Sequence, residues 1–294
     1  MMPIVVEKRI RQVKALREMQ QNIKNWYVIP FFRLGLLKKT TFAIKNGERV
    51  EIKNLREYYN FFSGEKWWRQ KMARYKDRIT ISRSIVTFDK KLRFRYYTDI
   101  DLGQTLWRIY EIFINNEYKV DVKNRVVINI GANIADTAIR FILDGAEKVI
   151  GYEPFPNSFK LAQENIKLNN LQNRITLINA GLGKKSSVVR LPESSLNTTV
   201  LSAERMTKIK GKKVKIITLG DIARRLPRVD TIIEMDCEGC EYPTILTADN
   251  DTLRHFSEFI LEYHRAPGTL LDKFKDAGFI AGIEGTVIHA VRED

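Results

Sequence analysis

Acidic residues and a histidine stand where two apolar segments of this sequence end. Asp236 and Glu238 follow one such segment, and Glu262 and His264 fall at the end of another. A positioned carboxylate or imidazole can remove a proton from a reacting hydroxyl, which accelerates the reaction by about 10²–10⁴-fold. If the two segments are neighbouring strands, their ends meet. We then expect Asp236 first, and His264 second, to act as the base, with Glu262 and Glu238 beside them.

The same side chains also suit a divalent cation. Carboxylates and imidazole are ligands of metal ions in proteins, and a bound cation lowers the pKa of a coordinated hydroxyl. Asp236, Glu262 and His264 are the possible ligands, although the sequence does not assign a metal. Glu238 and Glu241 have a second interpretation, because acids near a helix N-terminus interact favourably with the helix dipole. General base catalysis, metal assistance and a plain surface role for His264 all stay open.

A glycine and an acid mark a candidate cofactor site earlier in the chain. Gly131 directly follows the apolar run 126–130, and Glu153 directly follows the next run, 148–152. Glycine allows a tight turn with close backbone approach, and an acid at the end of the second strand can accept hydrogen bonds from a ribose. The Gly-x-Gly-x-x-Gly pattern of a dinucleotide site is incomplete, which disfavours NAD and FAD. A nucleoside cofactor without phosphates, such as S-adenosylmethionine, fits better.

Residues 125–294 alternate short β-rich runs with helical segments. Strands are expected at 126–130, 148–152, 175–179, 231–235 and 258–263, and helices at 136–143 and 157–169. Such alternation predicts an α/β fold with a parallel sheet covered on both faces. The runs 279–283 and 286–292 are joined by Glu284-Gly285, which predicts a terminal antiparallel hairpin. Ligands of such sheets bind at the carboxyl ends of the strands, near the switch point.

Five blocks in this part of the chain occur in an order that one enzyme family shares. They are Val127-Ile-Asn-Ile-Gly-Ala-Asn-Ile-Ala-Asp136, Gly145-Ala-Glu-Lys-Val-Ile-Gly-Tyr-Glu-Pro-Phe-Pro-Asn-Ser-Phe159, Glu164-Asn-Ile-Lys-Leu-Asn169, Glu234-Met-Asp-Cys-Glu-Gly-Cys-Glu241 and Leu261-Glu-Tyr-His264. Together they strongly resemble the FkbM family of S-adenosylmethionine-dependent methyltransferases. The resemblance implies a Rossmann-like class I methyltransferase sheet, mostly parallel, over residues 125–294.

The resemblance also implies a set of cofactor-binding positions. Gly131, Ala132 and Asn133 would line the methionine end of the cofactor, Glu153 would bind the ribose, and Asp236 would face the transferred methyl group. The adenine would lie near the positions after the third strand, which are Asn179, Ala180 and Gly181. The remaining cofactor-binding positions are Asn129, Asp136, Thr137 and Pro154.

Three positions depart from the pattern of that family. Asn129 stands where the family usually has Asp, Ala135 where it usually has Gly, and Glu234 where it often has Lys. Asn keeps hydrogen-bond reach but loses the charge that neutralises the amino group of the cofactor, so a weaker affinity is expected. Ala135 is expected to be tolerable only at a negative φ. These departures keep open a non-catalytic binding protein on the same fold.

The positive charge of the chain is concentrated at its beginning. The 294 residues include 50 Lys+Arg and 35 Asp+Glu, a net charge of +15. Residues 1–124 contribute +14 (27 basic and 13 acidic residues), and residues 125–294 contribute +1 (23 and 22). A positive field confined to one segment favours a polyanionic partner, which is nucleic acid, an anionic membrane surface or a phosphorylated substrate. We therefore expect a basic N-terminal region, residues 1–124, before a methyltransferase domain, residues 125–294.

The basic N-terminal region is predicted to be mainly helical. Apolar residues at helical spacing predict a basic amphipathic helix over residues 6–27, and Asn46-Gly47 predicts a hairpin within residues 42–52. Residues 54–78, which are rich in aromatic and basic side chains, are expected to be helical. Their aromatic rings either pack in a core, which we prefer, or stack on nucleobases.

Composition excludes several other classes of protein. With 44% apolar and 29% charged residues, the chain is typical of a globular protein. No uninterrupted apolar run approaches the ~18 residues of a membrane-spanning helix, and the first residues lack a signal-peptide pattern. Cys237 and Cys240 are interpreted as two small residues beside a strand end rather than as a redox or zinc half-site. A cytoplasmic protein is expected, with peripheral membrane attachment left open.

These observations predict an S-adenosylmethionine-dependent O-methyltransferase acting on a hydroxyl of a sugar or glycoconjugate, which is the substrate class that the resemblance implies. The alternative acceptor is RNA or DNA, bound through residues 1–124. The acceptor pocket is expected to be shaped by residues 186–215, where Asn197, Thr198 and Thr199 are the polar candidates.

Overall fold

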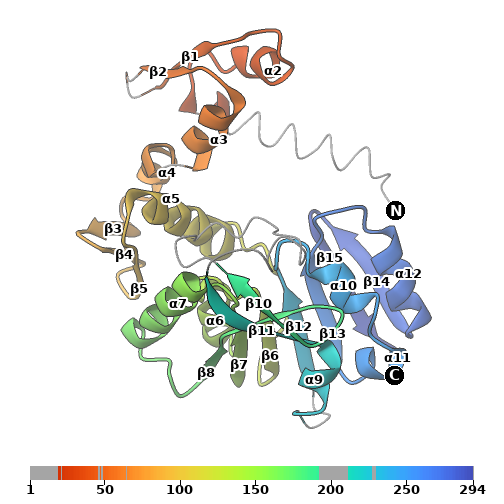
Figure 1. The fold of residues 1–294 in the computed structure, drawn as a ribbon. Coiled ribbons are helices and arrows are strands. Elements are labelled where there is room, and N and C mark those ends of the chain that lie inside the picture. Colours follow the sequence, from red (N-terminus) through yellow and green to blue (C-terminus); the bar gives the residue numbers. More distant parts are fainter. Residues whose placement is uncertain are drawn as a thin grey trace. The chain divides into compact units, whose positions relative to one another are not determined.

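The computed structural model describes residues 19–20, 22–45, 47, 49–63, 65–191, 211–226 and 230–293 (Figure 1). The chain divides into two compact units, one of residues 1–90 with 96–107 and the other of residues 91–95 with 108–294. Residues 108–124, which we expected in the N-terminal region, belong to the second unit. Most of the helix predicted over residues 6–27 lies outside the described residues, as do Asn46, Asn197, Thr198 and Thr199.

The second unit is built on a seven-stranded sheet. In order across the sheet, its strands are β14 (Phe279–Glu284), β15 (Val287–Arg292), β13 (Glu258–Glu262), β12 (Thr231–Met235), β6 (Val126–Ile130), β7 (Lys148–Tyr152) and β8 (Ile175–Ile178) (Figure 1). The strands from β13 to β8 are parallel, whereas β15 runs antiparallel to both β13 and β14. The predicted fold class, with its terminal antiparallel hairpin, is confirmed.

Burial explains why the central strands are unbroken apolar runs. All five residues of β12 and the last four of β6 are buried, so both faces of the sheet are covered. For example, the buried rings of Phe259 in β13 and Phe274 in α12 pack with their centroids 5.0 Å apart. The helices of this unit are α6 (Asp136–Leu143), α7 (Pro156–Leu168), α9 (Leu219–Ala223), α10 (Glu241–Ile245), α11 (Asn250–Leu253) and α12 (Gly268–Asp276).

The direction in which strands are added reverses between β6 and β12. From β6 the chain proceeds through β7 to β8, and it later returns to the other side of β6 as β12. Ligands of doubly wound sheets bind at the carboxyl ends of the strands beside such a switch point. The last residues of the two strands, Ile130 and Met235, are register partners. Gly131 and Asp236, which directly follow these two strands, therefore lie side by side.

A smaller three-stranded sheet was not predicted. In it, β11 (Lys212–Ile217) pairs parallel with β9 (Ala180–Leu182) and antiparallel with β10 (Ser187–Leu191). Its buried side chains Val189, Leu191 and Val214 form a separate small core with Phe155, which precedes α7. Most residues of β10 and β11 are exposed, so their sequences lack the continuous apolar run that marks a central strand.

The first unit is helical only in part. Its elements are α2 (Val28–Arg33), β1 (Thr40–Ala43), β2 (Arg49–Ile52), α3 (Leu55–Ser63), α4 (Glu65–Met72), a 3₁₀ turn (Ala73–Tyr75), β3 (Ile79–Ser82), β4 (Ile85–Phe88) and α5 (Asp99–Arg108). The last residue of α5, Arg108, belongs to the second unit. β1 and β2 form the predicted antiparallel hairpin, and β3 and β4 form a second hairpin that was not predicted. None of the described helices is both long enough and apolar enough to cross a bilayer.

The aromatic residues of the first unit pack against one another. The ring of Phe42 in β1 lies about 6 Å from the rings of Tyr58, Phe61 and Phe62, and the rings of Phe62 and Trp67 lie 4.7 Å apart. Tyr58 and Trp67 are buried. The interpretation of these rings as a core is confirmed, and the buried faces of Tyr58 and Trp67 cannot stack on nucleobases.

Candidate active site

The turn after β6 lies directly against the end of β12. The amide of Asp236 donates to the carbonyl of Ile130 (3.0 Å), and Gly131 has a φ of +93°. A Cβ at position 131 would lie 2.0 Å from the carbonyl oxygen of Asp236. Glycine is therefore required here both by the left-handed backbone and by the neighbouring loop. The close approach predicted for Gly131 is made to the protein's own backbone.

Glu153, at the carboxyl end of β7, is held by the backbone around it. Its Oε2 accepts a hydrogen bond from the Asn133 amide (2.8 Å), and its Oε1 accepts one from the Phe155 amide (2.7 Å). Burial raises the pKa of Glu153 to about 7, although these two hydrogen bonds act in the opposite direction. Each carboxylate oxygen keeps a second lone pair, so the group is able to accept further hydrogen bonds, for example from a ribose.

A small pocket that is open to solvent lies at this edge of the sheet. Its lining includes six residues that the sequence analysis selected, namely Gly131, Asn133, Glu153, Pro154, Asp236 and Glu238. The other three lining residues, which were not selected, are Arg108, Phe155 and Cys237. Phe155 and Cys237 lie within blocks that carry the family resemblance, so those blocks could have indicated them.

Arg108 is the functional side chain that sequence reasoning missed. It ends α5, next to a π-helical turn over Ile109–Ile114, in a segment without a recognisable motif. Its Nη1 lies 3.1 Å from Asp236 Oδ2 and 4.0 Å from Glu111 Oε2. Burial alone would lower the pKa of Arg108, but the charges of Asp236, Asp136 and Glu111 raise it well above its usual value. Arg108 therefore stays charged and holds one oxygen of Asp236.

Two of the departures from the family pattern face each other. Asn129 and Glu234 are register partners on β6 and β12, both are buried, and Asn129 Nδ2 donates a hydrogen bond to Glu234 Oε2. Burial and the charge of Asp236 raise the pKa of Glu234 well above its usual value, which favours the neutral form of the acid. A hydrogen-bonded Asn–Glu pair thus stands where the family pattern would place Asp beside Lys. Asn129 is engaged by this pair and does not line the pocket.

Ala135 adopts the conformation that we expected it to avoid. It has a φ of +67° at the start of α6, and it is fully buried. The expectation of a negative φ was wrong, because the turn that leads from Gly131 into α6 needs a left-handed residue at this position. For a residue with a Cβ this conformation costs about 1–2 kcal/mol.

The other predicted cofactor-binding residues lie outside the pocket lining. Asn179 Nδ2 donates to the carbonyls of Glu153 (2.8 Å) and Pro154 (3.1 Å), so it fixes the backbone at the end of β7. The remaining residues of this group are buried, and they are Ala132, Asp136, Thr137, Ala180 and Gly181. Their contact with a cofactor stays a prediction.

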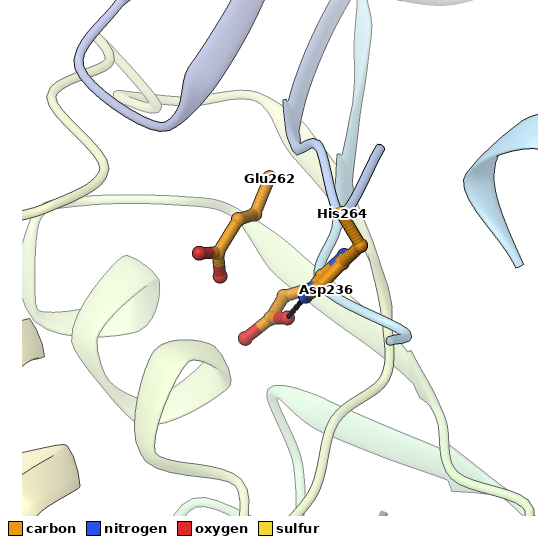
Figure 2. A group of neighbouring side chains, drawn as sticks. All are labelled: Asp236, Glu262 and His264. Carbon is orange, nitrogen blue, oxygen red and sulfur yellow. Dashed lines mark ion pairs between the residues drawn. The ribbon is translucent and has the colours of Figure 1, made fainter. Parts of the chain in front are cut away.

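The predicted catalytic residues come together at the ends of β12 and β13. His264 Nε2 lies 3.8 Å from Asp236 Oδ1 and 3.4 Å from Glu238 Oε2, and His264 Nδ1 lies 3.2 Å from Glu241 Oε1. Glu262 and His264 both direct their side chains toward Asp236 (Figure 2). One oxygen each from Asp236 and Glu262 and one nitrogen of His264 lie within 4.8 Å of one another.

Two members of this group, Glu262 and His264, retain protons at neutral pH. Burial lowers the pKa of His264, but its contact with Glu241 and the charges of Glu262 and Glu238 raise it to about 9. Burial and the charge of Asp236 raise the pKa of Glu262 to about 9 and also raise that of Glu238. In the free chain, His264 is therefore an imidazolium at neutral pH, and it cannot accept a proton until it has lost its own.

The two cysteines next to Asp236 form a disulfide, which was not predicted. Glu238 and Gly239 have φ angles of +57° and +113°, and the loop that they form brings the Cα atoms of Cys237 and Cys240 to 5.5 Å. That separation is usual for a disulfide. The interpretation of the cysteines as two separate small residues was wrong, because a loop with two left-handed residues cannot be read from the spacing alone.

Comparison with known families gives one match over this region. The family described as "Methyltransferase FkbM domain" matches residues 129–281, which is more than half of the chain. A curated protein of Methanocaldococcus jannaschii, provisionally named a protein N5-glutamine methyltransferase, is 44% identical over 52 residues. That match covers 18% of this chain and 26% of the relative, so the chain spans about a quarter of the length of that relative.

Comparison with solved structures gives several matches of low similarity, among them the following two. A methyltransferase FkbM from Methylobacillus flagellatus aligns with a TM-score of 0.42 and 16% identity, over 64% of this chain and 54% of that chain. TrmK of M. capricolum, in complex with S-adenosylhomocysteine, aligns with a TM-score of 0.32 and 11% identity, over 58% of this chain and 62% of that chain. Likenesses at this level concern the fold alone.

Proposed function

This chain belongs to the FkbM family of S-adenosylmethionine-dependent methyltransferases, and on that premise we propose that it methylates a hydroxyl of a sugar or glycoconjugate. Membership of the family gives the reaction and the methyl donor, whereas the acceptor class is the proposal. It is supported above all by one observation, the group of proton-binding side chains that surrounds Asp236 at the ends of β12 and β13.

The pocket suggests how the cofactor binds. Glu153 would accept the ribose hydroxyls, and Phe155 would lie beside the adenine. The turn that begins at Gly131 would hold the methionine end, as the family resemblance implies. Asp236 lies between this turn and His264, so the methyl group would face Asp236. The acids at this edge suit the positive charge of the sulfonium.

The chemistry requires alignment and one proton acceptor. A lone pair of the acceptor oxygen forms the bond to the methyl carbon, while the carbon–sulfur bond breaks and its electron pair stays on sulfur. The products are the methyl ether and neutral S-adenosylhomocysteine. The hydroxyl proton would pass to Asp236, with Glu238 on the same loop as the second acceptor. Alignment supplies the larger share of the rate, and the base about 10²–10⁴-fold.

An acceptor with several hydroxyl groups can also contact the other polar side chains near Asp236, which are Glu262 and His264. Neighbouring hydroxyls of a sugar both donate and accept hydrogen bonds, so they can pair with Glu262 and with the protonated His264. These two residues would orient the acceptor, which explains why several polar side chains lie beyond the one that faces the methyl group.

The test is methylation by an Asp236→Asn variant. The assay measures release of S-adenosylhomocysteine and the mass of the product, with sugars, glutamine-containing peptides and RNA as separate acceptors. We expect methylation of a sugar that the variant loses by about 10²–10⁴-fold, while its affinity for the cofactor stays within a few-fold. Asp230→Asn, at the opposite end of the same strand, is the matched control.

Two outcomes would reject parts of this proposal. Full activity of Asp236→Asn would reject the assignment of Asp236 as the base. Methylation of peptide or RNA but of no sugar would reject the acceptor class, and the charge of +14 on residues 1–124 makes RNA the second candidate. If RNA is the acceptor, log K for binding to a duplex should fall by about 0.9 per phosphate contact for each tenfold rise in salt concentration. Absence of binding at low salt rejects the RNA candidate.

A further inference from the structure

Three side chains from two neighbouring strand ends converge on one small space. Asp236 follows β12, Glu262 ends β13, and His264 follows two residues later; all three point toward this space (Figure 2). Their nearest ligand atoms lie within 4.8 Å of one another. Ligand atoms about 2.1 Å from a six-coordinate ion lie about 3–4 Å from one another. Side-chain shifts of about 1 Å would therefore close the three around a cation.

One oxygen of this group is buried without a partner. The side chain of Asp236 is 10% exposed. Its Oδ2 is held by Arg108 at 3.1 Å, whereas its buried Oδ1 receives no hydrogen bond from any residue within the described ranges. His264 Nε2 is 3.8 Å from Oδ1, which is beyond hydrogen-bond distance. Leaving a buried carboxylate oxygen unpaired is unfavourable, so Oδ1 is oriented for a ligand that the chain itself does not supply.

The other ring nitrogen of His264 is positioned by a buried acid. His264 Nδ1 lies 3.2 Å from Oε1 of Glu241, whose side chain is 0% exposed and which also accepts a hydrogen bond from the Cys237 amide (3.1 Å). Metal-binding histidines usually direct the second ring nitrogen to a carboxylate, which fixes the ring and its tautomer. Here the 3.2 Å ion pair with Glu241 places Nδ1 beside such a carboxylate, without the alignment of a hydrogen bond. Glu241 thus leaves Nε2 facing Asp236.

We propose that Asp236, Glu262 and His264 bind one divalent cation, with Mn²⁺ as the representative ion. Two carboxylate oxygens and one imidazole nitrogen form a mixed ligand set that suits Mn²⁺, which accepts both oxygen and nitrogen ligands. Three protein ligands leave coordination positions open for substrate, as in catalytic rather than structural sites.

The role of the cation in catalysis rests on the proposed function, although its binding does not. A hydroxyl of the acceptor would occupy an open position, where the cation lowers its pKa and orients it. Its proton would pass to Glu238, which lines the pocket and is not one of the three ligands. In this arrangement the cation, rather than Asp236, would activate the acceptor hydroxyl.

The test uses the full chain, dialysed against a chelator and titrated with MnCl₂. Electron paramagnetic resonance reports the free ion, so no substrate or activity is needed. We expect one bound Mn²⁺ per chain, and binding weaker by at least about tenfold in Glu262→Gln. We expect a loss of about 10–100-fold in Glu241→Gln, because Glu241 is not one of the three ligands but positions His264. His289→Gln is the matched control, because His289 contacts Glu258 at the other end of β13; it should bind as the wild type does.

Each result decides the proposal. Circular dichroism establishes that every variant is folded before its binding is compared. Absence of Mn²⁺ binding by the wild type, or equal binding by Glu262→Gln, overturns the metal site. Sugar methylation that persists in the chelator-treated wild type then leaves the proposed function intact. Bound Mn²⁺ that is lost in the two variants, without methylation of any sugar, supports the metal site and counts against the proposed function alone.

Discussion

The two ends of β13 carry the same residue types in opposite electrostatic settings. At its amino end, Glu258 contacts His289 and Arg125, and Arg125 also binds Asp230 (2.7 Å). Burial alone would raise the pKa of Glu258, but the hydrogen bonds from His289 and Arg125 outweigh it and lower the pKa. The pKa of Asp230 is also lowered, because Ser257 and Arg125 outweigh the effect of burial. The negative charges of the acids at this end of β13 are therefore balanced by neighbouring cations and hydrogen-bond donors.

At the carboxyl end, acids exceed the cations that could compensate them. Burial and the charge of Asp236 raise the pKa of Glu262 to about 9, and the pKa of Glu238 is raised as well. His264 is protonated, but it is shared among several acids. The compensated acids at the amino end of β13 therefore serve the stability of the fold. The carboxyl end, at the switch point where ligands bind, keeps an excess of acids that only external protons or cations can balance.

Substituting the glycine at the switch point is expected to have the largest effect. Gly131→Ala would place a Cβ 2.0 Å from the Asp236 carbonyl oxygen, at a φ of +93°. We expect a loss of at least about 3 kcal/mol in the free energy of unfolding, together with loss of cofactor binding. Gly145→Ala, before β7, is the matched control: φ is +102°, but the nearest atom to the new Cβ would be in the Lys123 side chain, at 3.4 Å. It should cost about 1–2 kcal/mol. Equal losses in urea denaturation would contradict the account.

Neutralising one acid at each end of β13 tests the comparison directly. Glu258→Gln is expected to lower the free energy of unfolding by about 2 kcal/mol, because it removes the charged partner of a largely buried Arg125. Glu262→Gln is expected to leave stability unchanged or to raise it at neutral pH, because Glu262 is already protonated there. Urea denaturation of both variants decides the point. A greater loss from Glu262→Gln would reverse the comparison.

Cofactor affinity is expected to depend on pH through Glu153. Its pKa is about 7 in the fold and 4.5 in a model compound, so the folded state binds the extra proton between these values. The free chain therefore gains stability as the pH falls from 7 to 4.5. Cofactor binding that needs the ionised carboxylate should weaken by up to about tenfold per pH unit below 7. Calorimetric titrations above and below pH 7 measure the change in cofactor affinity. The same pH dependence in Glu153→Gln would show that another group causes it.

The smallest effect is expected at the left-handed alanine. Ala135→Gly would remove the Cβ from a residue at a φ of +67°, and we expect stabilisation by about 0.5–1 kcal/mol. Thermal unfolding measures the change. A lower melting temperature would mean that packing of the buried methyl group outweighs the backbone strain.

The parallel sheet and most of the pocket lining could be predicted because both depend on local patterns. Gly131 and Glu153 each directly follow a buried strand, and such strands are continuous apolar runs whose order determines which ends meet. Asp236 and His264 were found by the same reasoning. Their position relative to each other needed only the adjacency of β12 and β13.

The remaining features depend on contacts that no local pattern records. The pairing of Asn129 with Glu234 requires the register of β6 and β12, and each residue alone looked like an unfavourable departure. Arg108 reaches Asp236 across 128 residues of sequence. The disulfide of Cys237 and Cys240 depends on the backbone angles of the loop between them.

The central claim, that S-adenosylmethionine binds at the carboxyl ends of β6 and β7, is tested most directly by calorimetric titration of the wild type, Glu153→Gln and Glu147→Gln. Glu153 follows β7, whereas the exposed Glu147 precedes the same strand, so one strand provides both the variant and its control. We predict binding with a Kd on the order of 1 μM, about −8 kcal/mol, weakened by about 10–100-fold in Glu153→Gln and unchanged in Glu147→Gln. No binding by the wild type, or equal binding by all three proteins, would contradict the claim.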